Sequence, residues 1–185
     1  MPRLNFVKKA RKDNPVVKRG ESYYWWQHAF SYKQFSATQP RRSQLTRSAF
    51  YASVWDLQDS TGEAYINSVE GATELAETTA EEVRQIGEEC QNSLDNMPEQ
   101  LQYAPTGELL QERIDNMDSV ADELENIDWS EFEEKETLLE EHAKIDQEDE
   151  EAYDEWLMEH LEFDEEIDWS EALSLITECL DNIEA

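Results

Sequence analysis

The fold of this chain is decided by residues 69–97, VEGATELAETTAEEVRQIGEECQNSLDNM. Small and apolar residues recur here at alternating spacings of three and four, at Val69, Ala72, Ala76, Thr79, Val83, Ile86, Cys90, Ser93 and Met97. This spacing places them on one face of an α-helix, and acidic residues crowd the opposite face. Because the face is small and only moderately apolar, we expect it to pack against another helix of the same chain.

The next segment supplies that partner helix. Pro98 ends the first helix, and Thr106 is a candidate N-cap for a second helix that runs to about Asn126. The same spacing recurs at Leu110, Ile114, Met117, Ala121 and Leu124. Two such helices joined by a short loop predict an antiparallel helical hairpin.

A five-residue sequence then occurs twice. Ile127–Glu131 and Ile167–Glu171 both read IDWSE, and each has the Asp-x-x-Glu spacing of a helix capping box. We therefore predict two similar helix starts, because five residues are too few to show a tandem duplication. Between the copies we expect helix with a break near residues 146–151. The last helix should run from about Ser170 to Ile183, with an apolar face of Leu173, Ile176, Leu180 and Ile183.

The N-terminal part has a different period. Residues that alternate with a period of two predict a β-hairpin with a turn near Ser31-Tyr32. In this hairpin, one strand face carries Tyr24, Trp26, His28 and Phe30. One aromatic face must pack on something, since an isolated hairpin is only marginally stable. A helix should then run from a cap at Ser43 to about Gln58, with a buried stripe of Leu45, Ala49 and Ala52 and with Phe50, Val54, Trp55 and Leu57 beside it.

Together these patterns predict a mostly α protein with a small N-terminal β-hairpin, an α+β head on an acidic body of helical-hairpin or bundle type. The expected divisions are residues 1–58, a basic aromatic hairpin with one helix; residues 59–128, an acidic helical hairpin; and residues 129–185, acidic C-terminal helices.

Charge is divided between the two ends of the chain. Residues 1–50 hold eleven of the fifteen Lys and Arg residues but only two acids, for a net charge of +9. Residues 51–185 hold four basic residues and forty-three acids, for a net charge of −39. Such asymmetry bears on binding partners and solubility rather than on catalysis.

The basic part is a candidate nucleic-acid interface. Its cations can neutralise phosphates, and aromatic side chains on a basic sheet can stack on bases. Positive charge at the start of a helix opposes the helix dipole, so Arg41, Arg42 and Arg47 are better explained by a partner. The predicted phosphate contacts are Lys8, Lys9, Arg11, Lys12, Lys18, Arg19, Arg41 and Arg42, and the predicted stacking residues are Tyr24, Trp26 and Phe35.

Patterns of catalytic and metal sites are absent from the sequence. His28, His142 and His160 have no metal-binding spacing, and the glycines are too isolated to form a phosphate loop. The acids that begin at Asp146 lack the glycine and the final glutamate of a calcium loop. We therefore expect no catalytic residues, no metal and no cofactor. We read Cys90 and Cys179 as core thiols of a reduced cytosolic protein, and no apolar run is long enough to cross a membrane.

Several segments resemble a family of tailed-bacteriophage proteins whose function is unassigned. They are VKKARKD (7–13), KRGESYYWW (18–26), PRRSQLT (40–46), NMPE (96–99) and GELLQER (107–113). The sequence departs from the family pattern at Ser31-Tyr32, where a glycine-rich turn is expected. The resemblance implies the cytoplasm of a phage-infected bacterium as the setting, and it supplies no catalytic residues.

These observations favour a non-enzymatic phage accessory protein that binds nucleic acid, or a nucleoprotein machine, through its basic aromatic N-terminal part. The alternative is that the acidic body imitates nucleic acid and inhibits a host nucleic-acid-binding or defence enzyme. A structural component of the virion is a third reading. The helical body could also form a homo-oligomer.

Overall fold

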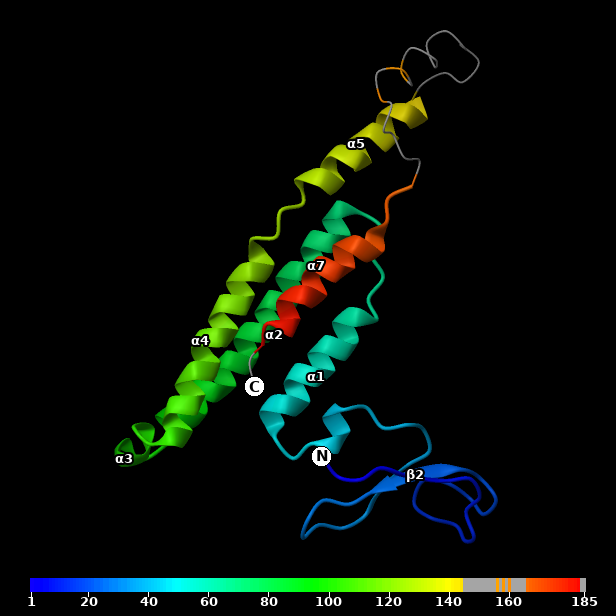
Figure 1. Cartoon of the computed structure of the whole chain (residues 1–185), viewed down its shortest axis with the longest axis vertical. Helices are drawn as coiled ribbons and strands as arrows, with labels where there is room; N and C mark the ends of the chain where they lie inside the picture. Colours follow the sequence, from blue (N-terminus) through cyan, green and yellow to red (C-terminus); the bar gives the residue numbers. More distant parts are fainter. Residues whose placement is uncertain (145–155, 157, 159, 161–165, 184–185) are drawn as a thin grey trace. The chain divides into compact units, whose positions relative to one another are not determined.

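The computed structural model describes residues 1–144, 156, 158, 160 and 166–183. The chain divides into two compact units, a head unit over Met1–Asp59 and a body unit over Ser60–Glu184. Helices predominate, and the one sheet in the described part of the chain has three antiparallel strands near the N-terminus (Figure 1). The predicted fold class, mostly α with a small β element, is confirmed.

The sheet of the head unit is a meander in the order β1-β2-β3, formed by β1 (Asn5–Val7), β2 (Tyr23–Trp26) and β3 (Gln34–Ser36). Phe6 pairs with Tyr24, and Trp25 pairs with Phe35. The predicted hairpin is present as β2 and β3. The sequence pattern missed β1, because three residues are too few to display a period of two.

The predicted strand alternation through Phe30 is wrong. β2 ends at Trp26, and the chain turns between His28 and Ser31, where the Ser31 N–H donates to the His28 carbonyl at 3.2 Å. Phe30 adopts a positive φ of 62° within this turn. His28 and Phe30 therefore do not share a strand face with Tyr24.

The helix predicted from Ser43 begins later. Residues Ser43–Leu45 form a short 3-10 helix, η1, and Thr46 is extended, so the α-helix α1 spans Ala49–Gly62. The Ser48 hydroxyl accepts from the backbone N–H of Tyr51 at 3.4 Å, which makes Ser48 the residue that caps the first turn. The predicted stripe shifts with the helix start: its buried members are Phe50, Val54 and Leu57, while Ala49 is exposed and Leu45 and Ala52 are half-buried.

The predicted helical hairpin of the body unit is confirmed. Helix α2 spans Val69–Asp95 and lies antiparallel to α4 (Pro105–Glu125), with the short helix α3 (Glu99–Gln102) at their junction (Figure 1). Seven of the nine predicted α2 positions are buried. Ser93 is exposed in the last turn of the helix, and Met97 lies beyond its end at Asp95 and is half-buried. Gly87, which the pattern did not include, is also buried, and a Cβ at this position would lie 3.1 Å from the Cβ of Met117.

Helix α4 differs from its prediction mainly at its start. Ala104 occupies the N-cap position and Pro105 begins the helix, so Thr106 lies inside the first turn. Ile114, Met117, Ala121 and Leu124 are buried as predicted, together with Val120, while Leu110 is half-buried.

Both IDWSE copies start helices, as predicted. Helix α5 spans Ser130–Lys144 and α7 spans Trp169–Asp181, and α7 packs against α4 and α2. In α7, Ile176 and Leu180 are fully buried and Leu173 is half-buried. The predicted break at residues 146–151 lies outside the described residues.

Candidate nucleic-acid interface

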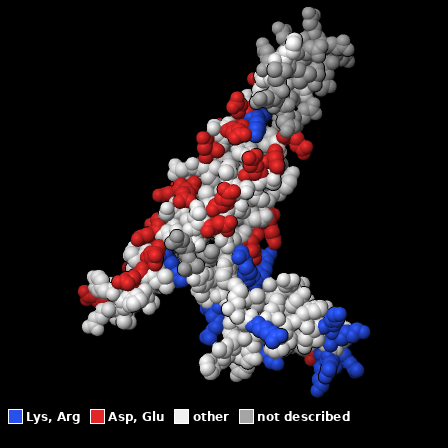
Figure 2. Space-filling model, in the orientation of Figure 1, with Lys and Arg blue, Asp and Glu red and all other residues white. Residues whose placement is uncertain are grey.

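The predicted phosphate contacts gather on one loop of the head unit. Residues 8–22, here called the basic loop, connect β1 to β2. Its six cations are all exposed: Lys8, Lys9, Arg11, Lys12, Lys18 and Arg19. Figure 2 shows lysine and arginine side chains gathered on the head unit. The structure thus brings six of the eight predicted phosphate contacts onto one connection between strands.

The basic loop is folded rather than a loose tail. The Ala10 N–H donates to the Glu21 carbonyl at 2.7 Å, and the Gly20 N–H donates to the Ala10 carbonyl at 2.9 Å. Gly20 has a φ of 100°, which other residues rarely adopt. Ala10 and Val17 are buried and anchor the loop. The Asn14 side chain adds a turn, since its Oδ1 accepts from the N–H of Val17 at 2.9 Å.

Both acids of the loop hold its backbone. Asp13 Oδ1 accepts from the backbone N–H of Arg19 at 2.7 Å, and Glu21 Oε2 accepts from the backbone N–H of Lys18 at 2.7 Å. The carboxylates therefore brace the loop through main-chain bonds, and the cationic side chains project into solvent. Six positive groups against two negative ones leave the loop strongly basic.

The predicted stacking residues do not form one surface. Trp26 is only 5% exposed, and its buried Nε1 makes no hydrogen bond within the described residues. Tyr24 is half-buried against Phe6, with ring centroids 4.9 Å apart. Phe35 pairs with Trp25 and therefore lies on the other face of the sheet. Trp26 is thus a core residue, and Tyr24 and Phe35 face opposite ways.

The most exposed aromatic residues of the head unit were not among the predicted stacking residues. Phe6 is 52% exposed, Tyr32 is 92% exposed and Phe30 is fully exposed. Residues 28–33, here called the aromatic turn, join β2 to β3 and carry the last two of these side chains. A positive φ is a genuine outlier for a bulky residue such as Phe30. The break in the alternating pattern at Ser31-Tyr32 was the only feature of the sequence that indicated this turn.

Arg41 and Arg42 are exposed, but the structure gives Arg42 partners within the head unit. Its Nη2 lies 3.3 Å from Gln58 Oε1 and 3.7 Å from Asp59 Oδ1, and its guanidinium lies 5.7 Å from the Trp55 ring centroid. These contacts tie Arg42 to α1. The dipole argument for an external partner therefore does not hold for Arg42. This residue precedes the short helix η1, and side chains of α1 supply its contacts.

The body unit carries the opposite charge. Exposed acids cover the helices in Figure 2, and Arg84 of α2 bridges to Glu125 and Asp122 of α4. The hydrogen bond between Arg84 and Glu125, and then the attraction between their charges, raises the pKa of Arg84 and lowers that of Glu125. Lys135 and Lys144 pair with Glu131 and Glu140 one turn earlier on α5. These pairs offset only a small part of the negative charge.

The described residues contain no group of three side chains that could hold a metal ion. Cys90 and Cys179 are both free thiols. No helix in the described part of the chain combines the length and apolar composition that a membrane crossing requires.

No protein-family model, curated protein or solved structure matches the chain. Function must therefore be inferred from the charged and exposed side chains themselves.

Proposed function

We propose that this protein binds single-stranded nucleic acid through its head unit, as a non-enzymatic accessory protein of a phage-infected bacterial cell. The basic loop contacts phosphates, and the aromatic turn stacks on unpaired bases. The observation that carries this proposal is the use of Asp13 and Glu21 as main-chain acceptors. A loop braced in this way presents its cations already ordered, so binding costs less conformational entropy than it would with a flexible tail.

The geometry of the sheet supports a single strand over a duplex. The basic loop precedes β2 in the chain and the aromatic turn follows it, so the two lie at opposite ends of this four-residue strand. Such a strand is about 13 Å long. A nucleic acid that contacts both ends must lie along the sheet, past the half-exposed Phe6. Stacking on Phe30 and Tyr32 requires bases that are free of a complementary strand.

The test is binding of the full-length protein to labelled single- and double-stranded DNA and RNA across a salt series. We expect tighter binding to single strands and a steep loss of affinity with salt. Replacing four loop cations by glutamine (Lys8, Lys9, Arg11 and Lys12) should reduce the logarithmic salt slope by about 3, because each phosphate contact contributes roughly 0.7. Replacing Phe30 and Tyr32 by alanine should weaken binding without changing that slope.

The matched control neutralises Lys135 and Lys144, which are already paired on α5. This variant should bind as the wild type does. Absence of binding at low salt, or equal loss of affinity in the control and the loop variant, contradicts the proposal.

A second candidate function rests on the body unit. Its described helices expose a large excess of carboxylates, and a surface of this kind can occupy the nucleic-acid channel of a host enzyme. Under this alternative, the loop variant keeps its inhibitory activity against a restriction or related nuclease. Replacing Glu133, Glu134, Glu136 and Glu141 of α5 by glutamine then abolishes the inhibition.

A further inference from the structure

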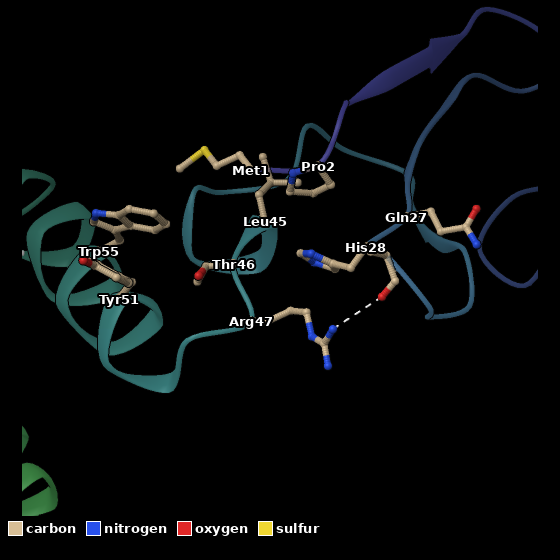
Figure 3. Close-up of a pocket in the computed structure, with 10 residues that line it drawn as sticks. Met1, Pro2, Gln27, His28, Leu45, Thr46, Arg47, Tyr51 and Trp55 are labelled. Carbon is tan, nitrogen blue, oxygen red and sulfur yellow. Dashed lines mark hydrogen bonds between the residues drawn. The ribbon is translucent and has the colours of Figure 1, made fainter. Parts of the chain in front are cut away.

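The head unit contains a pocket of about 510 Å³ that none of the preceding assignments uses. It lies where the aromatic turn, η1 and the first turns of α1 meet, and Figure 3 shows its lining. The residues that line it are Met1, Pro2, Gln27, His28, Ala29, Leu45, Thr46, Arg47, Tyr51 and Trp55. Its volume falls within the range of about 300–1,000 Å³ that is usual for small-ligand sites.

One side of the pocket is flat and apolar. Tyr51 and Trp55 stand one turn apart on α1, and their rings stack with centroids 5.5 Å apart and planes 29° from parallel. Leu45 lies between this pair and the opposite side of the pocket (Figure 3). The guanidinium of Arg42 approaches the Trp55 ring at 5.7 Å, so positive charge also lies beside this wall. A planar ring is the group that such a wall accommodates.

The opposite side is cationic and rich in donors. Arg47 donates to the Ala29 carbonyl at 3.4 Å, which directs its side chain toward the aromatic turn and leaves most of its five N–H groups for other acceptors (Figure 3). The His28 ring points into the space between Arg47 and Leu45 (Figure 3). Thr46 accepts from the Ser48 N–H at 3.1 Å, so its own hydroxyl proton can be donated.

Carboxylates are absent from the lining, although the chain has forty-five acids. A flat apolar wall that faces an arginine, a histidine and a hydroxyl matches a ligand with a planar ring at one end and an anion at the other. Arginine recognises phosphate through paired N–H groups, and aromatic walls accept any nucleobase.

We infer that this pocket binds one nucleoside monophosphate unit, with the base against Trp55 and the phosphate at Arg47 and His28. The unit is either a free mononucleotide or an unpaired nucleotide of a bound strand. Only the second source rests on the proposed function. In that case the pocket continues the path that begins at the basic loop, because Ala29 of the aromatic turn belongs to both surfaces.

The test follows the indole N–H resonance of Trp55 in the full-length protein by two-dimensional NMR, assigned with Trp55→Phe. Titration with AMP, CMP, GMP and UMP should shift this resonance, and a short single strand should shift it at lower concentration. Arg47→Gln should weaken mononucleotide binding by at least about tenfold, since a lost charge-assisted hydrogen bond has this effect. The matched control is Lys144→Gln, which removes an exposed cation that is paired with Glu140 on α5 and should leave mononucleotide affinity unchanged.

The outcomes separate the two proposals. If the strand binds and mononucleotides at millimolar concentration leave Trp55 unshifted, the pocket inference fails while the proposed function stands. If mononucleotides bind and the strand does not, the pocket is a site for free nucleotides and the proposed function fails. If benzoate or inorganic phosphate binds as tightly as AMP, the inference that the ligand is a nucleoside monophosphate is wrong. Unchanged Trp25 and Trp26 resonances in Arg47→Gln show that the head unit remains folded.

Discussion

The rings of Phe132 and Trp169 stack with centroids 5.9 Å apart and planes 22° from parallel. Trp169 belongs to the second IDWSE copy, and Phe132 directly follows the first. Trp129 of the first copy meets Phe132 edge-on at 6.0 Å. The two helix starts that share a sequence therefore also share a hydrophobic cluster, which joins α5 to α7.

Phe132 is the buried centre of this cluster, at 4% exposure. Phe132→Ala should lower the free energy of unfolding by about 3–5 kcal/mol, because the cavity adds to the lost burial. Phe132→Leu should cost less than about half of that, since it keeps most of the volume. Urea unfolding followed by circular dichroism measures both. A loss below about 1 kcal/mol in the alanine variant would show that α5 and α7 do not depend on this contact.

Gly107 provides a test of the junction between α2 and α4. A Cβ at this position would clash with the backbone carbonyl of Gln102, so the backbone between α3 and α4 would have to move. Gly107→Ala should destabilise the protein by about 1–3 kcal/mol, despite the better helix propensity of alanine. Gly62→Ala is the matched control, because nothing lies within 4 Å of its Cβ position. Thermal unfolding should show a lower Tm for Gly107→Ala alone; equal Tm values in the two variants would contradict the structure.

The sequence predicted the helical hairpin well because spacings of three and four persist over about three heptads, from Val69 to Cys90. Boundaries were less predictable. Ser43 has the chemistry of an N-cap, but extended Thr46 separates it from α1, and Ser48 takes that role. Nothing in a single sequence marks such a local break between the 3-10 helix and the α-helix.

The candidate interface was predicted only in part. Charge density alone identified the basic loop, since a cluster of cations is visible without a structure. The exposure of each aromatic side chain could not be predicted from the sequence. Trp26 and Phe30 have the same place in the alternating pattern, yet Trp26 is buried and Phe30 is fully exposed. The turn at Ser31 decides this difference, and the pocket beside it depends on tertiary contacts between η1, α1 and the aromatic turn.

Burial raises the pKa of both thiols, Cys90 and Cys179, and the carboxylate of Glu123 raises that of Cys179 further. The thiolate is the reactive form, so both cysteines should react slowly with a thiol reagent at neutral pH. Cys179 should react before Cys90, because it is only half-buried. Reaction kinetics of Cys179→Ala and Cys90→Ala assign the two phases. A fast phase that survives in Cys179→Ala would show that α2 opens to expose Cys90.

The Asp168 carboxylate caps α7 and accepts from the Ser170 hydroxyl at 2.6 Å and from the Ser170 N–H at 3.0 Å. These bonds lower the pKa of Asp168, so its contribution to stability is complete above the ordinary aspartate pKa of about 4 and is lost as the pH falls through the lower folded value. Asp168→Asn keeps an acceptor at the cap but removes this titration. The stability difference between wild type and Asp168→Asn should therefore shrink or reverse as the pH falls below about 4. A difference that does not change with pH in urea titrations would contradict the assigned cap.

The charge of the body unit predicts that salt stabilises the fold while it weakens nucleic-acid binding. Residues 60–184 hold 41 acids and 4 basic residues, a net charge of −37, and repulsion among these carboxylates is relieved when the chain unfolds. Raising the ionic strength from about 0.01 M to about 0.1 M shortens the Debye length from about 30 Å to about 10 Å, which screens this repulsion in the folded state. The Tm should rise, by roughly 2–4 °C for each kcal/mol gained in a chain of this size. Arg84→Gln removes the cation that bridges Glu125 and Asp122, so its Tm should be lower at low salt and should rise more steeply. A Tm that falls with salt would mean that the ion pairs outweigh the repulsion.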